Sequence, residues 1–177
     1  MTANCITIHT DLDEKTYRSY MNFHVFKKDR GWLVQLLLCL VIFIFGLMNY
    51  QVHSPILGTV FVLLSLYLLI TRFLRFYISL NRICETYGLS DKPKHFYTLV
   101  VSDAGLRVSN QTENTVYQWE QVYHAYCFPH MIYLYMNRST AFLLPDTRME
   151  GGTEAELREI IKKHLPEERL TLKGELS

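Results

Sequence analysis

The stretch that decides the fold runs from Trp32 to Thr71 and reads WLVQLLLCLVIFIFGLMNYQVHSPILGTVFVLLSLYLLIT. It contains two apolar runs, Trp32 to Tyr50 and Pro55 to Thr71, joined by the residues Gln51 to Ser54. Neither run contains Asp, Glu, Lys, Arg or His, the side chains that lipid hydrocarbon rejects most strongly. Because the connection leaves room only for a turn, we predict a transmembrane hairpin of two antiparallel helices, with both flanks on one side.

The charges around the hairpin predict its orientation. Basic residues precede the first run and follow the second, whereas the turn contains only His53 as an ionisable residue. By the positive-inside rule, both termini are expected in the cytoplasm and the turn outside. The predicted contacts with the membrane surface are Lys27, Lys28, Arg30, Arg72 and Arg75. A topology signal is the simpler interpretation of these residues, and specific binding of anionic headgroups is the alternative.

Aromatic side chains at the ends of the apolar runs predict where the helices meet the membrane surface. Trp32, Tyr50 and Tyr77 are placed as interface anchors. An apolar stripe at helical spacing continues beyond Thr71, and Gly88 then supplies a stop. We therefore predict a cytoplasmic helix extension at residues 72–88.

Residues 1–31 are predicted to form a strand and an amphipathic helix. The strand is expected at Cys5 to His9. Thr10 followed by Asp13 resembles a capping box, with Asp in place of the usual Glu, and so predicts the start of a helix. Gly31 is expected to interrupt that helix close to the membrane.

From His95 the sequence changes from helical spacing to alternation. Short segments rich in Val, Tyr, Phe and Leu are separated by turn residues, which predicts an antiparallel meander. The predicted strands are 95–101, 106–110, 115–119, 122–128, 131–136 and 141–144. Thr153 and Glu156 form a capping box ahead of an apolar stripe that ends before Pro166, so a helix closes this unit. Residues 166–177 are predicted to be a flexible tail.

Several matched segments, in order, give the chain a family resemblance. They are Asp13-Glu14-Lys15-Thr16-Tyr17, the two apolar runs, VSDAGLRV at 101–108, YQWEQV at 117–122, Tyr133-Leu134-Tyr135 and AFLLP at 141–145. On these segments the chain resembles the YcxB-like family of bacterial membrane proteins. The resemblance implies a pleckstrin-homology-like (PH-like) domain at residues 95–165, a bent β-sheet closed by a C-terminal helix. The expected fold class is therefore a membrane α-hairpin plus an α+β domain, located in a bacterial inner membrane.

Composition and cysteine spacing exclude several kinds of protein. The net charge is +1 and the signs are mixed after His95, which argues against a nucleic-acid partner. The cysteines Cys5, Cys39, Cys84 and Cys127 show no paired spacing. They are expected to be small buried residues in a reducing compartment.

The residues that could carry chemistry all have a simpler structural interpretation. His124, Cys127 and His130 form an HxxCxxH string, yet on a strand the first two point to opposite faces. Asp103 lies in an SDAG segment, where Asp before Gly serves the turn itself. Trp119, followed by Glu120, is expected to pack in or around the core. We therefore predict no catalytic residue, no cofactor and no metal.

Two functional hypotheses follow from this sequence. The first is a non-enzymatic interaction or regulatory module held at the cytoplasmic surface, with the lipid bilayer and an unidentified protein as partners. The second is an oligomer that forms a pore or gives immunity against a toxin or peptide antibiotic, since Gly46, Gly58 and Ser65 permit close helix contact. An enzyme that uses Asp103, Glu120 or a histidine is a third hypothesis.

Overall fold

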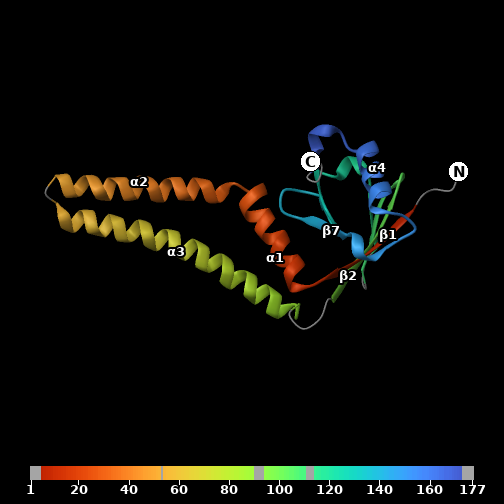
Figure 1. Ribbon diagram of the computed structural model, residues 1–177, viewed down its shortest axis with the longest axis horizontal. Helices are drawn as coiled ribbons and strands as arrows, with labels where there is room; N and C mark the ends of the chain where they lie inside the picture. The colour runs from red at the N-terminus through yellow and green to blue at the C-terminus, as the bar shows by residue number, and fades with distance from the viewer. Residues whose placement is uncertain (1–4, 53, 90–93, 111–113, 173–177) are drawn as a thin grey trace. The chain divides into compact units, whose positions relative to one another are not determined.

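The computed structural model describes residues 5–52, 54–89, 94–110 and 114–172. The chain forms two compact units (Figure 1): a helical unit, Leu12–Pro93, and a β unit made of Met1–Asp11 and Lys94–Ser177. The predictions about His53, about the polar turn at 111–113 and about the end of the tail at 173–177 lie outside the described residues.

The β unit contains two sheets. Their orders are β4-β3-β2-β1-β8 and β7-β6-β5-β9. The strands are β1 (Ile6–Leu12), β2 (Lys94–Ser102), β3 (Gly105–Ser109), β4 (Asn114–Tyr117), β5 (His124–Phe128), β6 (Met131–Tyr135), β7 (Ala141–Pro145), β8 (Met149–Glu150) and β9 (Leu170–Leu172). Each predicted strand after His95 is present, so the α+β class with antiparallel pairing is confirmed.

The predicted single meander is wrong at one place, because the chain changes sheet between β4 and β5. β4 ends at Tyr117, and residues Trp119–Gln121 form a 3₁₀ turn. Trp119 is only 5% exposed in this turn, and its indole Nε1 donates a hydrogen bond to the carbonyl of Ser102 (3.0 Å). Burial of the Trp119 ring therefore accompanies the corner between the two sheets.

Both sheets and the helix α4 (Glu154–His164) contribute to one hydrophobic core. Fully buried core residues include Ile8 and Leu99 from the first sheet, Leu134 from the second and Leu157 from α4. The predicted capping box is confirmed: the Thr153 N–H donates to Glu156 Oε2 (2.8 Å), and the Glu156 N–H donates to Thr153 Oγ1 (3.3 Å).

The predicted cap at Thr10 is wrong, because Thr10 lies inside β1. Inward-facing residues of β1 alternate with partly exposed ones, and Thr10 is among the buried ones. Its hydroxyl donates to the carbonyl of Leu143 (2.9 Å). Asp13 caps the following helix instead, since its Oδ1 accepts from the N–H of Thr16 (2.8 Å).

The structure also corrects two predictions about the ends of the chain. Part of the predicted tail is ordered, because β9 pairs in parallel with β5, and Thr171 Oγ1 lies 2.8 Å from His124 Nε2. Cys5 is exposed rather than buried, since it precedes the first core residue of β1, Ile6. The other three cysteines are buried, as predicted.

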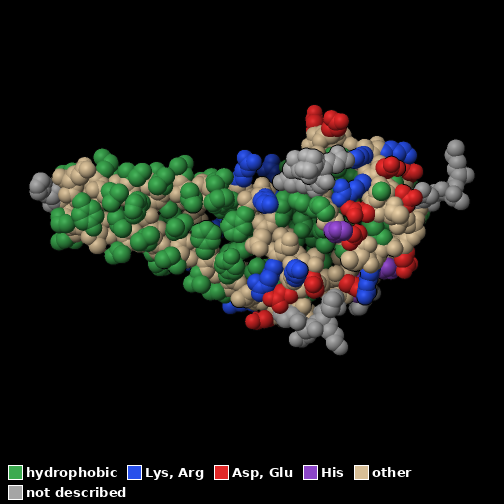
Figure 2. Space-filling model, in the orientation of Figure 1, with side chains coloured by type: hydrophobic (Ala, Val, Ile, Leu, Met, Phe, Trp, Pro, Cys, Tyr) green, Lys and Arg blue, Asp and Glu red, His purple; other side chains and the backbone are tan. Residues whose placement is uncertain are grey.

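The helical unit has at its centre a hairpin of two long apolar helices. Its elements are α1 (Glu14–Asn22), the π-helical segment η1 (Phe23–Lys28), α2 (Gly31–Gln51) and α3 (Pro55–Thr86). The most apolar windows of α2 and α3 have mean hydropathies of 2.5 and 2.1, and both helices are long and apolar enough to cross a membrane. Figure 2 shows hydrophobic side chains covering much of the visible face of the hairpin.

The hairpin is closed by small residues along its seam. A Cβ atom on Gly58 would lie 2.9 Å from the Gly46 carbonyl oxygen and 2.9 Å from the ring of Tyr50. Farther along, the buried Ser65 hydroxyl donates to the carbonyl of Cys39 (2.9 Å). The backbones of α2 and α3 therefore approach too closely for any side chain at Gly58.

Substitution of Gly58 by Leu tests this seam. Leucine favours a helix over glycine by up to about 1 kcal/mol, so destabilisation of Gly58→Leu would come from crowding alone. We expect a loss of about 1–3 kcal/mol in reversible unfolding of the purified protein in mixed micelles.

Val60→Leu is the matched control, because Val60 is 53% exposed on the same helix. Its effect is expected to stay within about 0.5 kcal/mol. Equal stability of Gly58→Leu and the wild type would show that the seam is not close-packed.

Candidate functional site

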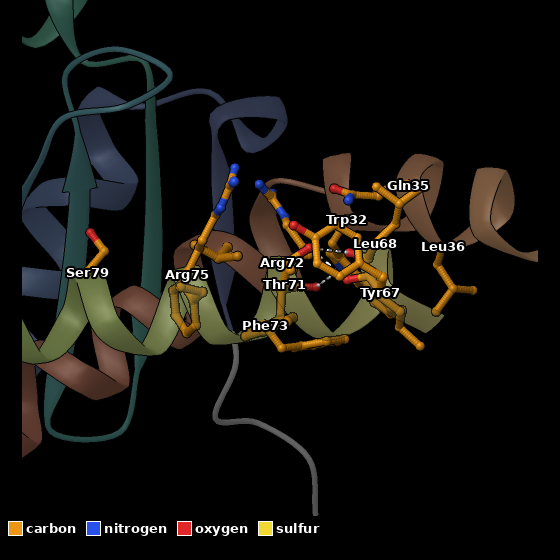
Figure 3. Close-up of a pocket in the computed structure, with 14 residues that line it drawn as sticks. Trp32, Gln35, Leu36, Tyr67, Leu68, Thr71, Arg72, Phe73, Arg75 and Ser79 are labelled. Atoms are coloured by element: carbon orange, nitrogen blue, oxygen red, sulfur yellow. Dashed lines mark hydrogen bonds between the residues drawn. The ribbon is translucent and has the colours of Figure 1, made fainter. Parts of the chain in front are cut away.

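A groove of about 460 Å³ lies in the helical unit, between η1, the first turns of α2 and the middle of α3 (Figure 3). Its size falls within the range of about 300–1,000 Å³ typical of small-molecule sites. The groove is at the end of the hairpin opposite the turn, where the predicted basic residues lie.

Aromatic rings form one wall of the groove. The ring of Phe26, from η1, stacks on Phe73 with centroids 6.2 Å apart and meets the edge of Phe76 at 5.4 Å. Trp32 packs edge-on against Phe26 (6.0 Å), and its Nε1 donates to the Phe26 carbonyl (3.0 Å). This hydrogen bond holds the indole ring in a fixed position beside the groove.

A short break between two helical segments separates Phe26 from Trp32 in the chain. The π-helical segment ends at Lys28, and α2 begins only at Gly31. Between them, Asp29 Oδ1 accepts from the Gly31 N–H (3.2 Å). The interruption expected at Gly31 is therefore present.

Polar side chains form the other part of the groove. Arg72, Arg75 and Ser79 are spaced at intervals of three and four residues, which places them on one face of α3. Gln35 of α2 also lines the groove, and Figure 3 shows both arginine side chains extending to the same side of α3. Within the described ranges, none of these four side chains has a hydrogen bond or ion pair.

The structure separates the predicted membrane-surface residues into two groups. Arg72 and Arg75 line the groove, together with the predicted anchor Trp32. The remaining basic residues lie outside its lining, at the end of η1 and before α2; they are Lys27, Lys28 and Arg30.

The other two predicted anchors also lie outside the groove. Tyr50 is at the far end of α2, where its hydroxyl lies 2.6 Å from Thr59 Oγ1. Tyr77 is exposed on α3, with its ring 5.5 Å from that of Phe76. Sequence reasoning missed Phe26 and Ser79; the helical spacing of Ser79 from Arg72 and Arg75 was the available signal. Gln35 is expected from the sequence only as a polar residue within a turn of the membrane interface.

Asp103 holds the β2–β3 turn against the end of α4 in the β unit. Its Oδ1 accepts from Lys163 Nζ and from His164 Nε2, both at 2.8 Å. The Lys163 hydrogen bond, followed by that of His164, lowers the pKa of the Asp103 carboxyl below its usual value. The ring of Trp119 stacks on His164 with centroids 5.1 Å apart. Asp103 and Trp119 thus both contact His164 at the end of α4.

The structure does not bring the HxxCxxH residues together. His124 lies on the partly exposed face of β5, whereas Cys127 faces the core. Burial raises the pKa of the Cys127 thiol to about 11, so it is protonated and a poor nucleophile at neutral pH. His130 instead pairs with Asp146 (2.5 Å), and this hydrogen bond raises the pKa of His130.

Among the residues that the structure describes, one group of side chains has the spacing needed for a cation. Ligand atoms of His130, Asp146 and Glu154 lie within 4.8 Å of one another. However, Arg158 Nη2 already contacts Glu154 Oε1 at 2.5 Å and also donates to the carbonyl of Phe128 (2.7 Å). These side chains therefore form surface ion pairs, and Arg158 already supplies the positive charge that balances Glu154.

Comparison with known families finds similarity in the β unit. Residues 101–162 match the family model described as YcxB-like protein, which covers less than half of the chain. The matched range extends from the end of β2 into α4 and excludes α2 and α3. No curated protein and no solved structure gives a significant match.

Removal of the Asp103 charge tests its structural role. Because its folded pKa is depressed, Asp103 stabilises the β unit above its unfolded pKa of about 3.9, and this contribution is lost as the pH falls through the folded value. Thermal unfolding of Asp103→Asn at pH 7 is expected to occur at a lower temperature than in the wild type. The difference should disappear in acid, once the pH has fallen below the depressed folded pKa.

Glu159→Gln serves as the control for Asp103→Asn, because Glu159 is an exposed carboxylate on the same helix α4. It should leave the unfolding temperature nearly unchanged at both pH values. A pH-independent difference between Asp103→Asn and the wild type would contradict the ionic role of Asp103.

Proposed function

We propose that this chain is a membrane-anchored cytoplasmic interaction or regulatory module of a bacterial inner membrane, without enzymatic activity. In this proposal the hairpin α2–α3 spans the bilayer, both termini are cytoplasmic, and the β unit is a PH-like domain that contacts a protein partner.

The observation that carries the proposal is the pairing of β1 with β2. These strands are neighbours in one sheet, yet residues 13–93 separate them and include the whole hairpin. Asp11 Oδ1 lies 3.0 Å from His95 Nδ1, and Thr98 Oγ1 lies 3.2 Å from His9 Nδ1. If the hairpin spans a membrane, the residues before and after it must be on the same side for this sheet to form.

The length of the two helices supports the role of an anchor. At 1.5 Å per residue, α2 is about 32 Å long and α3 about 48 Å, against a hydrocarbon core of about 30 Å. The end of α3 that carries Arg72 and Arg75 would therefore project from the bilayer. Confinement to the membrane surface raises the effective concentration of the β unit toward other membrane proteins.

The placement of the reactive side chains supports a non-enzymatic role. The Asp103 carboxylate is engaged by Lys163 and His164, and the Cys127 thiol is buried and protonated. The groove in the helical unit presents arginines, an amide and a hydroxyl, and its lining contains no carboxylate, histidine or cysteine. The described residues thus place no nucleophile beside a general base in that groove.

The alternative of an oligomeric pore receives less support. Asn49, Thr59 and Thr71 each donate to a carbonyl one turn earlier in their own helix, and the Ser65 hydroxyl bonds across the hairpin. Gly46 and Gly58 are buried between α2 and α3 of the same chain. The small residues that would permit contact between chains therefore serve the hairpin itself.

The exposed Cys5 offers a direct test of the orientation. A membrane-impermeant maleimide should not label Cys5 in intact spheroplasts and should label it fully after permeabilisation, because β1 is expected in the cytoplasm. The remaining cysteines are buried, so Cys5→Ser should abolish the signal.

Gln51→Cys in the Cys5→Ser background is the matched control, since Gln51 is exposed at the turn end of α2. It should be labelled in intact spheroplasts. Labelling of Cys5 without permeabilisation, or extraction of the protein without detergent, would contradict the proposal.

Photo-crosslinking in cells tests the interaction role. Val116 and Tyr123 are apolar residues of the β unit that are 63% and 46% exposed. A photoreactive phenylalanine at either position is expected to yield a discrete adduct with another protein, detected by gel mobility and mass spectrometry.

Val34, which is 72% exposed on α2, is the control position and is expected to face lipid. An adduct of two copies of this chain at Val34 would favour the oligomer instead. The absence of any protein adduct at both Val116 and Tyr123 would contradict the interaction role.

A further inference from the structure

We propose that the groove in the helical unit binds one anionic phospholipid, with the phosphate at Arg72 and Arg75 and an acyl chain along the hairpin. This inference rests on the proposed membrane anchoring and adds a specific ligand class and site to it.

The charge of the groove favours an anionic ligand. The Arg72 and Arg75 side chains lie one turn apart on α3 and extend to the same side (Figure 3). Neither forms an ion pair within the described residues, and the groove lining contains no Asp or Glu. Arginine donates several N–H groups in a planar arrangement that suits phosphate oxygens. A zwitterionic headgroup would leave part of this positive charge without compensation.

The apolar end of the groove favours a ligand with a hydrocarbon chain. Leu36 and Tyr67 line the groove away from Arg75 and Ser79, as Figure 3 shows. One turn farther along the hairpin, Leu40 on α2 and Leu63 on α3 are exposed. The apolar end of the groove thus adjoins exposed side chains predicted to face lipid, and a free phosphate would leave this end unoccupied.

The remaining polar groups fit the region between phosphate and acyl chain. Gln35 lies near Trp32 and Leu68, and within the described part of the chain its amide has no hydrogen-bond partner. The amide can donate to the ester carbonyl of a glycerolipid. The Thr71 hydroxyl is already engaged, because it donates to the carbonyl of Tyr67 (2.8 Å).

The aromatic side chains of the groove are held in place before any ligand binds. Phe26 stacks on Phe73, and the Trp32 indole is fixed by its hydrogen bond to the Phe26 carbonyl. Site preorganisation lowers the cost of ordering on binding. Trp32 therefore also provides a fluorescent reporter at the proposed site.

Quenching of Trp32 fluorescence tests the proposal with the full chain in phosphatidylcholine nanodiscs. The discs contain an increasing mole fraction of either phosphatidylglycerol or phosphatidylcholine with brominated acyl chains, which quench indole on contact. Trp32→Phe identifies the contribution of the other tryptophan, Trp119. We expect the brominated phosphatidylglycerol to quench Trp32 at an about tenfold lower mole fraction than the brominated phosphatidylcholine.

Two double variants distinguish a specific lipid-binding site from nonspecific electrostatic attraction to anionic lipid. Arg72→Gln with Arg75→Gln should abolish the preference for phosphatidylglycerol. Lys27→Gln with Arg30→Gln removes the same charge beside α2 but outside the groove lining, and should reduce the preference by less than about twofold. Equal losses in both variants would overturn the proposal in favour of surface charge alone.

The remaining outcomes distinguish the two proposals. Wild-type protein that inserts into the nanodiscs but shows no preference for phosphatidylglycerol overturns the lipid site and leaves the anchor intact. Failure to insert overturns the anchor and the lipid site together. Loss of the preference on addition of soluble glycerol phosphate would show that phosphate alone suffices, and would overturn the assignment to a phospholipid.

Discussion

The constraint on which the rest of the structure depends is the pairing of β1 with β2 across the inserted helical unit. β1 supplies the buried residues Ile6 and Ile8 to the core that the later strands complete. Neighbouring strands lie about 4.8 Å apart in a sheet. The chain that connects β1 to β2 must therefore leave the sheet and return to it at adjacent positions. A hairpin satisfies this condition, whereas a single spanning helix would place its two ends on opposite sides of a bilayer.

Local sequence signals predicted the elements of the fold, but their long-range pairing was not predictable. The apolar runs and the Thr153–Glu156 capping box are encoded within a few residues, and both are present. By contrast, the sheet change at Trp119 and the parallel pairing of β9 with β5 depend on residues far apart in the chain. Thr10 is a residue type that often caps helices, but it occupies an inward-facing position of β1, where its hydroxyl donates to the carbonyl of Leu143.

The candidate site shows a similar division. Basic residues at the ends of apolar runs were evident from the sequence, and Arg72 and Arg75 indeed line the groove. The groove itself depends on the π-helical segment and on the break between Lys28 and Gly31, which together bring Phe26 beside Trp32. The spacing of apolar residues predicts regular α-helices. It therefore could not predict a groove that depends on a π-helical segment and a break in the helix.

The position of β1 ahead of both long helices also has a consequence for biosynthesis. During translation β1 leaves the ribosome first, and β2 follows only after α2 and α3 have been made. β1 must therefore remain without its sheet partner until both helices of the hairpin have been made. Contacts between such distant segments form slowly, and β9, near the other end of the described chain, completes the second sheet last. Completion of the first sheet thus has to wait for synthesis of the whole helical unit.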